Sequence, residues 1–262
     1  ASKNPIDYQG TFIERSMANR RSHYTSISHY QRFSEKLGFT AGGGYRSGGQ
    51  FFKNNYTGAR ADADQSLRAH TRLLYRPCEV ANVDFIANYE FRSQDAFPYY
   101  IEHVSDNDRY KEQIVPIIGQ ITSNEDNVYL RHLLNVGVTV ECNWSKATLS
   151  NVLGFQLLND DVKMDRDFSF LDLGTLQQKQ YSRTLSEEVI LKSRLGAWRH
   201  WEWVTGACFS GQWLETERNE NVTYDSPRKN AALYHQSTLC DLFNAKGLAI
   251  TLGLRAEYEY ID

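Results

Sequence analysis

The sequence has no long apolar run, few cysteines and no excess of positive charge. No stretch approaches the roughly 18 consecutive apolar residues of a membrane-spanning helix, which excludes a helical membrane protein. The four cysteines show neither a CxxC motif nor a Cys/His spacing suited to zinc, which excludes a zinc-stapled domain. Four cysteines in 262 residues are also too few for a dense disulfide scaffold. A formal net charge of -3 argues against binding nucleic acid through bulk positive charge.

Aromatic residues and alternating polarity are what the sequence has in abundance. Aromatic side chains make up 13% of the chain, with 16 tyrosines, and this content excludes intrinsic disorder. The clearest alternation spans 248–260, where leucine, isoleucine, alanine and tyrosine take every second position and polar or small residues take most of the others. A helix would mix the two sets, whereas a strand places them on opposite faces. This segment is therefore predicted to be a strand with one apolar and one polar face.

Ten further strands are predicted from the same alternation. The clear examples and then the weaker ones are residues 37–45, 67–75, 83–91 and 134–142, followed by 10–18, 24–33, 147–158, 183–192, 201–213 and 231–242. Segment 172–192 has a helical alternative, because Thr184 and Glu187 have the spacing of a capping box. A strand is favoured there, since its neighbours are strands and sheets extend by pairing. The prediction is an all-β protein of about eleven antiparallel, up-and-down strands.

The connections between these strands alternate between short and long. The short ones are residues 34–36, 76–81, 143–146, 193–200 and 244–247, and the long polar ones are 46–65, 92–130, 159–180 and 214–230. A compact soluble sheet rarely needs several long loops. A transmembrane β-barrel of the outer membrane has tight turns on its periplasmic side and long loops on its extracellular side. Its strands also average as hydrophilic, in keeping with the mean hydropathy of -0.57.

Aromatic residues near the predicted strand ends favour the barrel over its main alternative. A soluble extracellular β-sandwich that binds carbohydrate would also alternate in polarity along its strands. A barrel, however, keeps aromatic girdles where its wall meets the two membrane interfaces. The residues predicted to form such girdles are Tyr45, Tyr75, Tyr89, Trp144, Trp203, Trp213 and Tyr258.

Several segments resemble TonB-dependent outer-membrane receptors. Ser2-Lys3-Asn4-Pro5 resembles the junction at which the plug domain of such a receptor passes into its first barrel strand. Successive strand-turn-strand units of these receptors are similar to residues 33–45, 73–77 with 82–85, 184–191 and 248–258. The resemblance covers essentially the whole chain.

The resemblance implies active uptake of a scarce, bulky nutrient across the outer membrane of a Gram-negative bacterium. A ferric siderophore, haem, cobalamin or a glycan is the expected cargo, and the TonB complex supplies energy through the plug. Such receptors resemble plugged barrels of about 22 strands. Residues 1–262 are therefore expected to be the first half of the barrel domain, with the plug and the second half outside this sequence. A passive porin-like barrel is the alternative that lacks a plug.

Half a barrel leaves two edge strands, near 10–18 and 248–260. Their unpaired backbone groups recruit partners and are not tolerated in lipid. We expect the edges to pair with the remaining barrel sequence or with another copy of the chain. The other expected partners are outer-membrane lipid, the TonB complex through the plug, and a small-molecule or metal-chelate substrate, but not nucleic acid.

Arg68 and Arg72 are candidate ligand-binding residues in the barrel lumen. They share the polar face of one predicted strand, and guanidinium groups bind carboxylates and phosphates well. The alternative is that they pair with acids of the plug, or with acids across the lumen such as Glu141, Glu257 and Glu259.

Phe97, Tyr99 and Tyr100 are the candidate ligand contacts at the extracellular mouth. They lie in the long loop 92–130, and binding residues concentrate in such loops, although a solvated loop is the alternative. No GxSxG motif and no histidine pair at ligand spacing occurs, so the sequence indicates no enzyme, no cofactor and no metal site.

Overall fold

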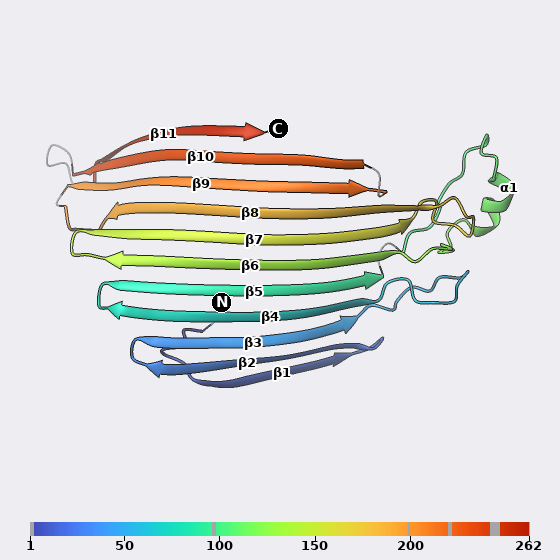
Figure 1. The fold of residues 1–262 in the computed structure, drawn as a ribbon, viewed down its shortest axis with the longest axis horizontal. Coiled ribbons are helices and arrows are strands. Elements are labelled where there is room, and N and C mark those ends of the chain that lie inside the picture. The colour runs from blue at the N-terminus through green and yellow to red at the C-terminus, as the bar shows by residue number, and fades with distance from the viewer. Residues whose placement is uncertain (1–2, 96–97, 199, 220–221, 242–246, 262) are drawn as a thin grey trace.

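The protein forms one antiparallel sheet of eleven strands in which every strand pairs with its neighbours in sequence (Figure 1). The computed structural model describes residues 3–95, 98–198, 200–219, 222–241 and 247–261. The strands are β1 (Gly10–Ala18), β2 (Ser22–Ser34), β3 (Leu37–Gly48), β4 (Asp64–Cys78), β5 (Ala81–Asp95), β6 (Val128–Asn143), β7 (Ala147–Asp165), β8 (Thr175–Ser193), β9 (Trp201–Arg218), β10 (Val222–Cys240) and β11 (Ala249–Ile261). The prediction of eleven up-and-down strands is confirmed.

The longest connections gather at one end of the sheet, which we call the loop end, and the other end carries the alternate turns (Figure 1). The loop between β5 and β6 contains a short helix, α1 (Lys111–Ile114), followed by the 3-10 turn η1 (Val115–Ile117). Neither these helices nor any other helix among the described residues has the length and hydrophobicity to cross a membrane.

Two predictions about the second half of the chain have different outcomes. Segment 183–192 is part of strand β8, so the strand interpretation is confirmed over the helical one. The long loop predicted at 214–230 is wrong, because β9 extends to Arg218 and β10 begins at Val222. Polar residues occupy both faces of this hairpin beyond the apolar band, so the sequence resembles a loop although Val222 pairs with Arg218. The predicted turn 244–247 lies mostly outside the described residues.

The register gives the sheet one apolar and one polar face, because directly paired residues point to the same side. A row on the apolar face links Phe39, Leu73, Phe85, Val138 and Leu153 through four successive pairs. A row on the polar face links Asn88, Asn135, Gln156, Thr184 and Gln212. The faces assigned from sequence alternation are therefore the faces of the assembled sheet.

The predicted girdle residues lie on the apolar face, except for Trp144, which is in the turn between β6 and β7. Those on the apolar face are Tyr45, Tyr75, Tyr89, Trp203, Trp213 and Tyr258. Trp203 and Trp213 are ten positions apart on β9. At about 3.3 Å per residue and a tilt near 40°, this spacing corresponds to an apolar band roughly 25 Å tall.

The N-terminal segment lies against the polar face and makes a small buried core there. Pro5 is fully buried and Ile6 is 5% exposed. A β-carbon at Gly38 would lie 2.8 Å from the carbonyl carbon of Pro5, so this position on β3 needs glycine to accept the segment. The turn is held by Asn4, whose Oδ1 accepts a hydrogen bond from the backbone N–H of Ile6 at 2.9 Å. The stretch that resembles a plug-to-barrel junction is thus anchored on the polar side.

The two outer strands, β1 and β11, each have a single neighbour among the described residues. Every residue of both strands is exposed. One sheet also excludes the predicted alternative of a β-sandwich over the described residues, since a sandwich packs two sheets face to face.

Candidate ligand-binding face

Arginine-carboxylate pairs cross neighbouring strands on the polar face. Arg72 contacts Asp84 through Nε and Nη2, with a shortest distance of 2.6 Å. Arg131 contacts Asp160 in the same two-point manner, at 2.8 and 2.6 Å. Tyr129 donates a further hydrogen bond to Asp160 at 3.2 Å. Such paired geometry fixes each guanidinium and stiffens the wall across β4–β5 and β6–β7.

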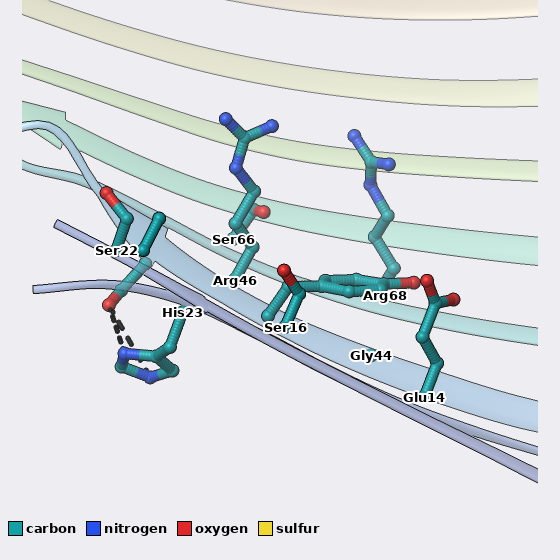
Figure 2. Close-up of a pocket in the computed structure, with 11 residues that line it drawn as sticks. Glu14, Ser16, Ser22, His23, Gly44, Arg46, Ser66 and Arg68 are labelled. Carbon is teal, nitrogen blue, oxygen red and sulfur yellow. Dashed lines mark hydrogen bonds between the residues drawn. The ribbon is translucent and has the colours of Figure 1, made fainter.

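A polar pocket of about 460 Å³ lies where β1 to β4 approach the loop end (Figure 2). Arg46 on β3 and Arg68 on β4 extend their guanidinium groups in the same direction, with Glu14 nearby on β1 (Figure 2). His23 bonds to Ser47 on the opposite side of these strands. We call Arg46, Arg68 and the pocket around them the arginine pocket.

Glycine residues on β3 leave the polar face without side chains next to the arginine pocket. Gly42 and Gly44 alternate on the polar face of β3, next to Arg46. The His70 ring occupies the space where Gly42 would carry a β-carbon, with its Nε2 2.7 Å from that position. A β-carbon at Gly44 would lie 3.2 Å from the Ser26 side chain. Gly42 therefore lets the His70 ring approach closely, and Gly44, which lines the pocket, adds no side chain beside the two arginines.

The two arginines predicted from sequence differ in how much of each guanidinium is free of a carboxylate and exposed to a ligand. Arg68 bonds to Glu90 only through Nε, at 2.9 Å, and its side chain is 66% exposed. Arg72 donates hydrogen bonds to Asp84 through both Nε and Nη2, and its side chain is 20% exposed. Both partners lie on the adjacent strand β5, and not across the lumen at Glu141 or Glu259.

Arg46 is the residue of this pocket that sequence reasoning missed. The predicted strand ended at Tyr45, so Arg46 fell into the loop 46–65, whereas β3 continues to Gly48. Extending the alternation by one position would have placed Arg46 on the polar face. Over the described residues, no carboxylate forms an ion pair with it.

The predicted aromatic contacts in loop 92–130 meet other loops at the mouth. Tyr99 packs edge-on against Phe168 at a ring-centroid distance of 5.2 Å, and Tyr56 stacks on Phe170 at 6.2 Å. Tyr99 and Tyr100 remain 52% and 53% exposed. Phe97 lies outside the described residues. The loop end thus presents exposed rings from three connections that are distant in sequence.

A buried polar cluster joins these three loops, and we call it the loop clasp. Asp165, at the end of β7, is fully buried and accepts hydrogen bonds from the Ser123 hydroxyl at 2.7 Å and the Asn124 N–H at 3.2 Å. The Asn54 side-chain amide donates to the Ser123 carbonyl at 2.7 Å. Ser169 donates through its hydroxyl to Asp167. Residues 49–63, 98–127 and 166–174 are therefore held as one unit.

The clasp is expected to tighten as pH falls from about 7.5 to 5. Burial raises the pKa of Asp167 to about 6; Ser169 opposes this rise and the Asp165 carboxylate adds to it. An acid whose pKa is raised on folding binds more protons in the folded state, so its stabilising effect is lost as pH rises through about 6. Backbone hydrogen exchange at 122–127 should be several-fold slower at pH 5 after correction for intrinsic rates. Asp167→Asn should remove this dependence, and an equal response in that variant would contradict the assignment.

Metal-ligating clusters do not form in the part of the chain that the structure describes: no three His, Cys, Asp or Glu side chains gather in a way that could hold an ion. All four cysteines are free thiols.

The sheet has the fold of part of the barrel wall of an outer-membrane receptor. Three solved structures illustrate this. The ferric yersiniabactin uptake receptor FyuA of Yersinia pestis is 13% identical, with a TM-score of 0.67 over 96% of this chain and 43% of its own. Pseudomonas aeruginosa FpvA bound to heterologous pyoverdines is 12% identical, with a TM-score of 0.70 over 95% of this chain and 37% of its own.

The third is the siderophore receptor PiuA of Acinetobacter baumannii, 9% identical, with a TM-score of 0.62 over 97% of this chain and 46% of its own. The chain therefore spans less than half the length of these structures. No family model and no curated protein matches the sequence. The likeness to these three receptors is one of fold.

Proposed function

We propose that this chain is part of an outer-membrane receptor that takes up a scarce, bulky nutrient in a Gram-negative bacterium. The observation that carries the proposal is the sheet with an apolar and a polar face, whose fold matches receptors described as taking up or binding siderophores. The apolar face contacts outer-membrane lipid, and the polar face lines the lumen. The TonB complex energises uptake through a plug, and no part of the receptor acts as an enzyme.

Residues 1–262 belong to the first half of the barrel domain in this proposal. The exposed edges of β1 and β11 pair with the remaining barrel sequence, or with another copy of the chain. Lipid supplies no hydrogen bonds to a strand edge, so a spanning wall has to close. Closure by the rest of the receptor gives about 22 strands, as expected of a plugged barrel.

Uptake by a deletion strain that carries the full-length receptor tests the function. Radiolabelled ferric siderophores, haem, cobalamin and glycans are offered with and without TonB. Saturable, TonB-dependent uptake of one of these compounds is expected. Uptake that rises in proportion to concentration and does not depend on TonB would indicate a passive porin instead. Recovery of the protein in the aqueous fraction would contradict a location in the membrane.

The arginine pocket supports an anionic chelate as the cargo. Arg46 and the exposed side of Arg68 offer two guanidinium groups to carboxylate or phosphate oxygens. Replacing both by glutamine should weaken binding of an anionic chelate about a hundredfold or more, because charge-assisted hydrogen bonds contribute roughly 1.5–3 kcal/mol each.

The matched control for this pair is Arg218→Gln. It removes an arginine of the same face, at the last residue of β9 and outside the arginine pocket. It should leave affinity unchanged. Equal loss in the control, or equal loss for a neutral chelate, would contradict an anion-specific role for Arg46 and Arg68.

A further inference from the structure

Arg183 is a charged residue on the apolar face, at the level of the aromatic boundary. On β8 it pairs directly with Leu157 of β7 and with Trp213 of β9. Its side chain is exposed, and no ion pair joins it to a carboxylate in the described part of the chain. A cation on a lipid-facing wall is costly near the midplane but is accommodated at the interface. Its position beside Trp213 places it at that interface.

Two grooves flank Arg183 on the apolar face. The groove toward β5 and β6 has a volume of about 410 Å³, and the groove toward β10 about 630 Å³. Leu134 and Leu157 line the first, and Phe155 and Leu185 line the second. Both therefore combine an apolar floor with the same guanidinium.

The other polar groups determine which of the two grooves favours an anion beside Arg183. The groove toward β5 and β6 contains Tyr89, His132 and Tyr181 but no carboxylate. The Tyr89 hydroxyl lies 2.8 Å from Nδ1 of His132. The opposite groove is lined by Glu215 and Asp225, which repel an anion. A negatively charged group at Arg183 is thus favoured on the His132 side.

We propose that Arg183 and the groove beside it bind a net-anionic, phosphate-bearing lipid of the outer membrane. The phosphate contacts the guanidinium, the tyrosine hydroxyls and His132 hydrogen-bond to the headgroup, and an acyl chain lies along Leu134 and Leu157. Charge complementarity and the interfacial position of these groups identify a membrane lipid as the occupant. The inference rests on the proposed function, since it requires the apolar face to contact a bilayer.

Lipid retention by the full-length receptor tests the inference. The receptor is purified from membranes and delipidated in detergent, and it is then titrated with phosphatidylglycerol or phosphatidylcholine and followed by native mass spectrometry. The wild type should retain phosphatidylglycerol at least tenfold more tightly than phosphatidylcholine. Arg183→Gln should lose this preference, and Leu157→Trp, which fills the groove and keeps the arginine, should weaken it as well.

Lys192→Gln is the matched control, because Lys192 lies on the same strand with its side chain on the polar face. It should bind lipid as the wild type does. Inorganic phosphate at millimolar concentration should not displace the lipid if the chain contributes to binding; full displacement would assign a free-anion site and overturn the lipid proposal. Equal retention by wild type and Arg183→Gln would also overturn it.

The two proposals fail in different ways. Normal nutrient uptake together with no lipid preference overturns the lipid site alone. A receptor that does not insert into bilayers overturns both.

Discussion

Replacing Arg131 by alanine is expected to lower the free energy of unfolding by about 3 kcal/mol, because it leaves a buried carboxylate without its cation. The Asp160 side chain is 8% exposed and accepts hydrogen bonds from Nε and Nη2 of Arg131. Among the described residues, the Tyr129 hydroxyl would be the one hydrogen-bond donor left to the Asp160 carboxylate. The measurement is denaturant unfolding of the full-length receptor in lipid vesicles, followed by tryptophan fluorescence.

Arg68→Ala is the matched control for that experiment. It removes the same kind of side chain from the same face, but the Arg68 side chain is 66% exposed and holds Glu90 through one nitrogen. Exposed pairs contribute about 0–1 kcal/mol. Equal destabilisation by the two variants would contradict the assignment of the Arg131–Asp160 pair as a structural tie between β6 and β7.

Replacing Asp165 by alanine is expected to cost about 2 kcal/mol in the loop clasp and to loosen the contact between residues 98–127 and loop 166–174. The change leaves the backbone N–H of Asp167 without its acceptor. The Ser123 hydroxyl and the Asn124 N–H lose their bonds to Asp165 but keep the carbonyls of Glu125 and Ser169. A buried donor left unpaired costs about 1–3 kcal/mol. Hydrogen exchange at 121–127 should accelerate by roughly thirtyfold, which corresponds to this loss.

Two further variants sharpen this prediction. Asp165→Asn keeps one acceptor oxygen and should lie between alanine and the wild type. Asp106→Ala removes an aspartate of the same loop whose side chain is 93% exposed and pairs with Lys111, and it should leave exchange unchanged. Unchanged exchange in Asp165→Ala would show that other contacts hold the loops together.

The position of each strand and the face on which each side chain lies were predictable, because both depend on the local alternation of polar and apolar residues. Leu67 and Leu73 on one side of β4, and Arg68 and Arg72 on the other, follow from a side-chain period of two. Strand ends were less predictable. Beyond the apolar band both faces are polar, as in 214–230, and the pattern no longer separates a paired hairpin from a loop.

The binding surfaces depended on contacts that the local pattern does not encode. Arg46 and Arg68 were assigned to a loop and a strand, and only the β3–β4 register brings them to one pocket. The carboxylate that lies opposite each arginine decides how exposed its guanidinium is: Asp84 accepts hydrogen bonds from Nε and Nη2 of Arg72, whereas Glu90 accepts one from Nε of Arg68.

The sequence by itself determined that this chain is an antiparallel sheet with an apolar and a polar face, because alternation along a strand is a local property of the backbone. Tertiary structure alone decided how the loops are joined and which arginines lie together. Ser123 and Asp165 are 42 residues apart, and Arg183 meets Trp213 only through strand pairing. Such contacts are fixed by register and loop packing, which the alternation of single residues does not specify.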